Sequence, residues 1–512
     1  MSLPSPSLPS PFHLHRWLLL SLLLPLIGPA AEKPNILVFL VDDMGVMDTS
    51  VPFLTGPDGE PKRYPLNDLF RTPSMERLAA SGIRFTTFYA NSVCSPSRTS
   101  LMTGQSSARH HTTQYIKPES NNAGTHGPQD WAWKGITDPA ITLPGVLRKN
   151  GYRTIHAGKA HFGPVGAFAE EPKNIGFDVN IAGCAWGQPG SYYGTENFGN
   201  GIPKRQRRAV PGLKQYHGQD INLTGALTLE INAEIKNAVD ADKPFFAYMS
   251  HYAVHAPFQP DKRFLPNYAG RTDLKKNAQA FASMIESMDK SLGDILDHLE
   301  KLGVAENTLV FFLGDNGSDA PLGKTHDVSC AAPLRGKKGT HYEGGMRVPF
   351  IASWAKRDSS NPHQQKLPIP AGVLTTQMAN ITDLYPTVLA ATGTENPNNH
   401  TVDGENINPL LQGAFPKREA TFLMHFPHSH RSSYFTSYRS GPWKLVYHYH
   451  QPGAGRTELF NLTTDPFESN DLSETDPATR TRLIKQMADA LEAADAQYPT
   501  SKNSPAKQLR PE

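Results

Sequence analysis

The stretch NILVFLV, from Asn35 to Val41, decides the fold class of this 512-residue chain. It is short, apolar after Asn35 and rich in β-branched residues, which is typical of a strand buried on both faces of a sheet. Two further runs of this kind follow, FFAYMS at 245–250 and TLVFFL at 308–313. Between them, residues 278–302 place apolar side chains on one face at helical spacing. Strands that alternate with helices predict an α/β domain with a large, mostly parallel β-sheet sandwiched by helices.

The pattern changes near residue 415. Residues 443–450 and 457–462 predict a β-hairpin, and residues 478–494 predict a final helix. We therefore expect a second, smaller folding unit after the α/β domain. The expected organisation is an α/β domain over 32–415, an α+β subdomain containing an antiparallel sheet over 416–500, and a polar tail over 501–512.

The first 31 residues have the three-part pattern of a secretory signal. Arg16 precedes an apolar run of 11 residues, and small residues follow at 28–31. That run is too short to cross a bilayer as a helix, which takes roughly 20 residues. We expect residues 1–31 to be cleaved and the protein to be exported, to the periplasm or the cell exterior, or to a lysosome in a eukaryote. An uncleaved anchor or a buried strand is the alternative. No later stretch is long enough for a membrane span in the mature chain.

The composition excludes several functional classes. Lys and Arg total 50 against 48 Asp and Glu, so a net charge of +2 shows no basic excess and we expect no nucleic-acid partner. A hydrophobic share of 38% is too high for a disordered chain. Three cysteines, Cys94, Cys184 and Cys330, are too few for a disulfide scaffold.

Polar residues directly follow two of the apolar strands. Asp42 and Asp43 come after the first strand, and Asp315 and Asn316 come after the strand at 308–313. Ligands of open α/β sheets bind at the carboxyl ends of the strands. Carboxylate and amide oxygens favour Ca²⁺ or Mg²⁺ over Zn²⁺. The sequence therefore predicts a divalent-cation site, although helix N-caps use the same residue types.

A cysteine stands at the start of a third candidate element, Cys94-Ser95-Pro96-Ser97-Arg98. Pro96 suits a first helical turn, so Cys94 is expected near a helix N-terminus, where the backbone favours negative charge. Arg98 adds a positive charge one turn further on. These residues predict an activated thiol, and a structural buried cysteine is the alternative.

This segment carries a family resemblance, since Cys94 to Arg98 match the C-x-P-S-R signature of type I sulfatases. Further elements of that family follow in order: G-K-x-H-x-G at 158–163, H-x-P at 255–257, G-D-N-G at 314–317, K-G-T-x-Y-E-G-G at 338–345, and the C-terminal segments 441–444, 458–462 and 465–466. The chain thus resembles arylsulfatase-like, formylglycine-dependent enzymes of the alkaline phosphatase superfamily over nearly its whole mature length. The resemblance implies their α/β fold.

The resemblance also implies a modified residue and a metal. A formylglycine-generating or other sulfatase-maturing enzyme would convert Cys94 to Cα-formylglycine, whose hydrate is the nucleophile. One Ca²⁺ per chain, in preference to Mg²⁺, would be bound by Asp42, Asp43, Asp315, Asn316 and the modified Cys94. Asp315 would take the proton of the attacking hydroxyl.

The remaining motif residues acquire roles by the same resemblance. Lys159 and Lys338 would clamp the sulfate oxygens, and Arg98 would hold the oxyanion of the hydrate. His255 would be the general acid for the departing oxygen, and His161 would deprotonate the second hydroxyl so that sulfate is eliminated. The adjacent Lys337 is a less favoured clamp, and His251 is a secondary candidate for the pocket wall.

The function implied is that of a secreted sulfatase, a sulfuric ester hydrolase acting on a sulfated carbohydrate or an aryl sulfate. The expected partners are therefore a sulfated small molecule or glycan and the maturing enzyme. One alternative is a phosphonate or phosphate ester hydrolase of the same superfamily. A non-catalytic glycan-binding homologue is another, and the intact motif set argues against it.

Specificity is less readable from the sequence. Three groups either contact a sugar or have only structural roles: the loop aromatics Trp131, Trp133, Trp186, Tyr192 and Tyr193, the basic run Lys204, Arg205, Arg207 and Arg208, and the C-terminal group His425, His428, His430 and Arg431. The basic run is either a solvated loop or an attractor for a polyanionic glycan. Once Cys94 is modified, Cys184 and Cys330 remain for one disulfide, if they meet.

Overall fold

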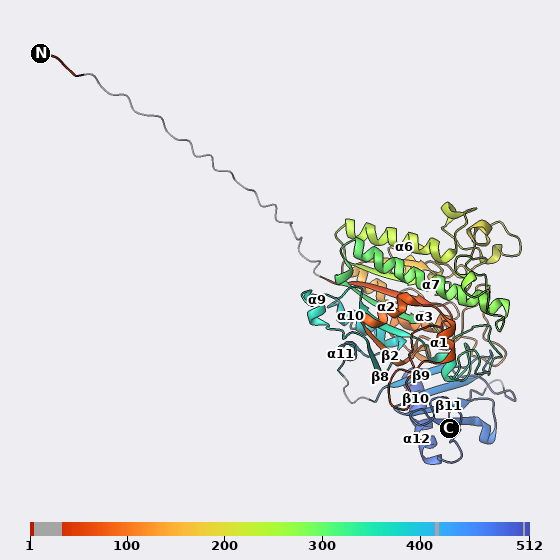
Figure 1. Cartoon of the computed structure of the whole chain (residues 1–512). Coiled ribbons are helices and arrows are strands. Elements are labelled where there is room, and N and C mark those ends of the chain that lie inside the picture. Colours follow the sequence, from red (N-terminus) through yellow and green to blue (C-terminus); the bar gives the residue numbers. More distant parts are fainter. Residues whose placement is uncertain (5–32, 415–418, 505–506, 512) are drawn as a thin grey trace. The chain divides into compact units, whose positions relative to one another are not determined.

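The computed structural model describes residues 1–4, 33–414, 419–504 and 507–511. Most of the expected signal segment, and the expected boundary at 415–416, lie outside the described residues and stay predictions. Lys33–Glu512 form one compact unit (Figure 1). Within the described parts, no helix is both long and apolar enough to cross a bilayer.

An eight-stranded sheet forms the centre of this unit, in the order β4-β3-β5-β1-β6-β7-β2-β8. Its strands are β1 (Asn35–Val41), β2 (Ile83–Tyr89), β3 (Arg153–Gly158), β4 (Val179–Ile181), β5 (Phe245–Ser250), β6 (Thr308–Gly314), β7 (Phe350–Trp354) and β8 (Val373–Asn380). β7 is antiparallel to both β6 and β2, and the other pairs are parallel. The predicted mostly parallel α/β sheet is confirmed.

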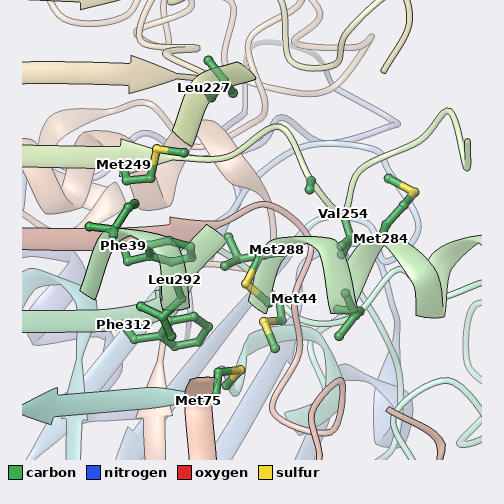
Figure 2. Close-up of a cluster of buried hydrophobic side chains, with 14 of the residues drawn as sticks. Phe39, Met44, Met75, Leu227, Met249, Val254, Met284, Met288, Leu292 and Phe312 are labelled. Atoms are coloured by element: carbon green, nitrogen blue, oxygen red, sulfur yellow. The ribbon is translucent and has the colours of Figure 1, made fainter. Parts of the chain in front are cut away.

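Helices cover both faces of this sheet. Alternate side chains of β1 point to opposite faces and so enter two different hydrophobic clusters. Phe39 belongs to the cluster that includes side chains of α2 (Pro73–Ser81), α6 (Leu223–Asp240) and α7 (Lys276–Lys301). Figure 2 shows Phe39 and Phe312 beside Met288 and Leu292 of α7. The opposite face packs on α3 (Cys94–Thr103), α5 (Leu143–Lys149) and α10 (Leu384–Ala391). Shorter helices are α1 (Pro65–Leu69), α4 (Ser107–His110), α8 (Glu343–Met346), α9 (Pro362–Lys366) and α11 (Asn408–Leu411).

A separate antiparallel sheet follows, in the order β12-β11-β10-β9 (Figure 1). It contains β9 (Thr421–Phe426), β10 (Phe435–Ser440), β11 (Trp443–His448) and β12 (Thr457–Asn461), and α12 (Pro477–Ala493) comes last. Leu483, Met487 and Leu491 of α12 pack on Leu445 and Leu459 of the sheet. The predicted hairpin is β11–β12, and the predicted last helix is α12. Sequence analysis did not predict α6, β4, β8, β9 or β10.

Four central strands end at one edge of the large sheet. Val41 of β1 pairs with Gly314 of β6, and Gly158 of β3 pairs with Ser250 of β5. β1 and β5 are in register as well, with Leu40 opposite Ser250. The residues that follow these strands are therefore delivered to the same place, as in other open parallel sheets.

Candidate active site

The turns after β1 and β6 build a buried acidic cluster. Asp42, Asp43 and Asp315 each offer an oxygen, and these oxygens lie within 4.8 Å of one another. The side-chain nitrogen of Asn316 donates to Oδ1 of Asp43 at 3.0 Å. Asp43 adopts a left-handed φ of 61°, which Asp tolerates better than most residues. Its backbone N–H donates to Oδ1 of Asp315 at 3.0 Å, so each strand end fixes the other.

Three oxygens of this cluster are buried and accept no hydrogen bond: Oδ1 of Asp42, Oδ2 of Asp43 and Oδ1 of Asn316. Buried acceptors without a donor are costly, so the arrangement favours a positive ligand. Burial, reinforced by Asp315, raises the pKa of Asp42 well above its usual range, and Lys159 offsets only part of this. A cation against the free oxygen would keep Asp42 ionised. Carboxylate and amide oxygens fit Ca²⁺ or Mg²⁺.

Cys94 is the first residue of α3, as its sequence context predicted. Two serines of the motif fix the approach to it. Oγ of Ser97 accepts the backbone N–H of Asn91 at 2.9 Å, and Oγ of Ser95 accepts that of Ile116 at 3.0 Å. The helix N-terminus presents free N–H groups, which stabilise negative charge at residue 94.

His161 faces Cys94 with one defined ring nitrogen. Nε2 donates to the carbonyl of Ile116 at 2.7 Å, which leaves Nδ1 as the acceptor. Nδ1 lies 3.3 Å from Sγ of Cys94. Burial, together with Lys159, lowers the pKa of His161 well below its usual range. A neutral imidazole with its lone pair aimed at residue 94 is arranged to accept a proton there.

Arg98 is fully buried and braces the acidic cluster from α3. Its Nε and Nη2 lie 2.9 and 2.8 Å from Oδ2 of Asp315. Nη1 donates to Oγ of Ser250 at 2.6 Å and to the carbonyl of Lys159 at 2.8 Å. The guanidinium therefore fixes Asp315 and joins the ends of β3 and β5.

Two lysines and a histidine line the other side of the cluster. Nζ of Lys159 lies 2.7 Å from Oδ2 of Asp42, and Nζ of Lys338 lies 2.6 Å from Oδ1 of Asp43. Burial alone would favour neutral Lys338, but Asp43 together with the other negative groups nearby outweighs burial and raises the pKa of Lys338. Nε2 of His255 lies 3.7 Å from Oδ2 of Asp43. Burial and then Lys338 lower the pKa of His255 to about 3, so its ring is neutral.

A second ion pair positions the loop that carries Lys338. Nζ of Lys337 lies 2.9 Å from Asp319, so it points to a different carboxylate from that of Lys338. Arg431 holds Asp319 through both of its Nη atoms, at 2.7 and 2.9 Å, and donates to the carbonyl of Lys338 at 3.0 Å. Arg431, a candidate sugar contact by sequence, braces this loop.

Several secondary candidates have structural roles. His251 is buried between Phe39 and Ser291 of α7, so its expected place in the pocket wall is wrong. Trp131 is buried and donates to Asn121, which makes it an anchor of its loop. His425 is likewise buried and hydrogen-bonded to Thr436 and Gln497. His428 is buried and hydrogen-bonded to Thr113 and Ala123.

Cys94, Cys184 and Cys330 are all free thiols, so the conditional disulfide is not formed.

Two residues near the site were missed by sequence reasoning. Ser250 ends β5 and binds Arg98, and its position at a strand end was a usable signal. Tyr192 donates from its hydroxyl to the carbonyls of Tyr252 and His255, at 2.6 and 2.8 Å, and so fixes the His255 loop. Tyr192 was singled out only as a pocket-rim aromatic. The sequence held no signal for this bond.

Comparison with known proteins gives two family matches. The model described as "Sulfatase" matches residues 34–394, and the one described as "N-sulphoglucosamine sulphohydrolase, C-terminal" matches residues 337–497. The N-acetylgalactosamine-6-sulfatase of Homo sapiens is 35% identical over 404 residues, covering 76% of this chain and 68% of that protein. Arylsulfatase A of Bos taurus is 30% identical over 471 residues, covering 88% and 81%.

The fold also matches solved structures. The crystal structure of Ps i-CgsB in complex with k-i-k-neocarrahexaose superposes with a TM-score of 0.68 at 25% identity. The match covers 91% of this chain and 94% of that one.

Proposed function

Since this chain belongs to the sulfatase family and is a sulfuric ester hydrolase, we propose that it removes sulfate from a sulfated carbohydrate at the site around Cys94. One observation carries the proposal. Three buried oxygens that accept no hydrogen bond lie near a helix-terminal cysteine, and the neighbour of that cysteine, His161, is neutral with an accepting nitrogen. Relatives named for a sulfated sugar support the carbohydrate class.

We propose that Cys94 is converted to Cα-formylglycine by a sulfatase-maturing enzyme and that Ca²⁺ is held by Asp42, Asp43, Asp315 and Asn316. When bound, the cation supplies positive charge to an oxygen nucleophile and to the sulfate, and the hydrated aldehyde supplies two hydroxyls on one carbon. The free oxygens of the cluster support the cation, and oxygen-only donors favour Ca²⁺ or Mg²⁺ over softer metals.

The chain's own residues then perform the proton transfers and the charge stabilisation. Lys159 and Lys338 bring ammonium groups to the equatorial sulfate oxygens, where the transition state spreads its charge. Arg98 holds the carboxylate of Asp315 in place. His161 accepts a proton at residue 94 through Nδ1.

His255 is placed to protonate the departing alcohol oxygen. Its Nδ1 donates to the carbonyl of Ala256 at 2.9 Å, so Nε2 is the nitrogen that faces the cluster. The ring is neutral in the free enzyme, because its pKa is about 3. His255 must therefore take up a proton from solvent when the anionic ester binds, because the charge of the ester favours the imidazolium.

The N-terminal segment supports export. Arg16, the following apolar run and the small residues at 28–31 form a secretory signal pattern. We propose that the mature enzyme begins near residue 32 and acts outside the cytosol.

The experiment compares two reactions on protein co-expressed with a maturing enzyme. Turnover of 4-nitrophenyl sulfate should exceed that of bis(4-nitrophenyl) phosphate, and the reverse order would favour the phosphate ester alternative. Cys94→Ala should abolish sulfate release, because the nucleophile is removed. Cys330→Ala is the matched control, since it removes another buried thiol. Full activity in Cys94→Ala would overturn the mechanism.

A further inference from the structure

A second charged cavity lies beside the candidate active site. It is a cleft of about 430 Å³ whose lining includes the four basic residues Lys204, Arg205, Arg207 and Arg208. Gln188, Pro189 and Gly190 form part of its wall, and Pro257 and Gln259 form another part. No role in the acidic cluster has been assigned to any of these residues.

Both of those walls continue directly into the active site. Pro257 is two residues from His255, so their Cα atoms are at most about 7 Å apart. Gln188 follows Gly187, which packs on the ring of His161. A Cβ added at Gly187 would lie 2.6 Å from that ring. The cleft therefore adjoins the two histidines that we assign to proton transfer.

Hydrogen bonds join the basic segment to the His255 loop. Arg205 pairs with Glu196, and Glu196 accepts from the side chain of Gln259 at 3.1 Å. Gln259 in turn accepts the backbone N–H of Tyr192 at 2.8 Å, and Tyr192 holds the carbonyl of His255. The basic residues thus stand on a braced wall.

The charges of the cleft do not cancel. Arg205 pairs with Glu196, and Arg207 pairs with Glu119 at 2.7 Å. Among the described residues, no carboxylate lies within ion-pair distance of Lys204 or Arg208. Two positive charges are left over in a chain whose total charge is only +2. Such a cleft attracts an anion.

We propose that this cleft binds a second anionic group of the substrate, so that the enzyme prefers polyanionic sulfated glycans to singly charged sulfate esters. The inference rests on the proposed function. His255 serves the departing alcohol oxygen, so the cleft on its loop lies on the leaving-group side. The group bound there belongs to the desulfated product, and it is a second sulfate or a uronate carboxylate.

The test uses Lys204→Ala/Arg208→Ala and two substrates, a disulfated disaccharide and 4-nitrophenyl sulfate. The ratio of kcat/KM between them should fall roughly ten-fold, because two charge-assisted contacts are lost. The loss should appear mainly in KM. Arg148→Ala/Lys149→Ala is the matched control, since it removes two exposed charges from α5, which does not line the cleft. An unchanged ratio, or an equal fall in the control, would overturn the proposal.

Binding to a Cys94→Ala background separates this inference from the proposed function. In calorimetry, the disulfated disaccharide should bind roughly ten-fold more weakly when Lys204 and Arg208 are also replaced. A monosulfated disaccharide bearing a uronate distinguishes a carboxylate from a second sulfate as the preferred group. Absence of sulfatase activity in the mature wild type would refute the function. An affinity that is unchanged when Lys204 and Arg208 are replaced would refute only the proposed role of the cleft.

Discussion

Two buried acidic clusters of this protein differ in one respect, whether their oxygens have partners. At the sheet edge, Asp42, Asp43 and Asn316 each leave an oxygen without a hydrogen bond. Where the second sheet meets the first, Glu343 of α8 accepts from Tyr89 at 2.9 Å and from Lys444 of β11 at 3.0 Å. This second group, with Glu468, we call the link cluster.

The carboxylates of the link cluster are saturated, which means that each of their oxygens accepts a hydrogen bond. Lys444 also donates to Oε1 of Glu468 at 2.6 Å, and Oε2 of Glu468 accepts the backbone N–H of Glu343 at 2.7 Å. Burial raises the pKa of Glu468 to about 7, and Lys444 offsets only part of this effect. Completed partnerships indicate a structural role, whereas unpartnered oxygens indicate a ligand site.

The sharpest separation is expected from Asp42→Asn. It keeps the shape of the side chain but removes a charge from the cation site, so kcat should fall about 10³-fold or more. Stability in chelator should also fall, because the variant leaves the buried ammonium of Lys159 without the carboxylate 2.7 Å away. Steady-state kinetics measure the change in kcat, and urea unfolding in chelator measures the change in stability.

Asp289→Asn is the matched control for that variant. Asp289 is a buried carboxylate bonded to the backbone N–H groups of Ser74 and Met75, far in sequence from the cluster. It should lower stability without lowering kcat. If Asp42→Asn and Asp289→Asn behave alike, the distinction between the two kinds of cluster fails.

Lys444→Met should lower stability and leave kcat nearly unchanged. It removes the ammonium group that Glu343 and Glu468 share, which should cost about 3–5 kcal/mol of unfolding free energy. The kcat of the folded fraction should stay within a few-fold of wild type. The double variant Lys444→Met/Glu468→Gln should recover much of the stability, since the remaining carboxylate, Glu343, still has Arg347 at 3.7 Å. If stability does not recover, the loss in Lys444→Met does not come from a buried carboxylate left without a positive partner.

Calcium should stabilise only through the unsaturated cluster. Added to chelator-treated protein at 100 times its Kd, it should raise the unfolding free energy by about 2.7 kcal/mol. Thermal unfolding should show this gain in Lys444→Met and not in Asp42→Asn. An equal gain in both variants would place the ion elsewhere.

A smaller effect is expected from Arg431→Lys. Lysine cannot reproduce the two-point contact with Asp319, so the Lys338 loop loosens by about 1 kcal/mol and kcat/KM falls roughly five-fold. Asp319→Asn should have a similar effect, and the double variant should be less than additive. Full additivity would mean that the pair does not act as a unit.

The sequence predicted the parts of the molecule that depend on local patterns. Apolar runs identified β1, β5 and β6, and their polar ends placed Asp42 and Asp315 at one edge. α6 was missed, and the edge strand β4 has only three residues. The sites of Arg431 and His251 depend on which elements pack together, Asp319 for one and α7 for the other. No spacing in the sequence carries that information.

The central claim is that residue 94 is a modified nucleophile held beside the unsaturated cluster. Mass spectrometry of the peptide containing residue 94, from active protein, tests it most directly. The account predicts a mass about 18 Da below that of the cysteine form, because CH₂SH is replaced by CHO. An unmodified thiol at residue 94 in fully active protein would contradict it.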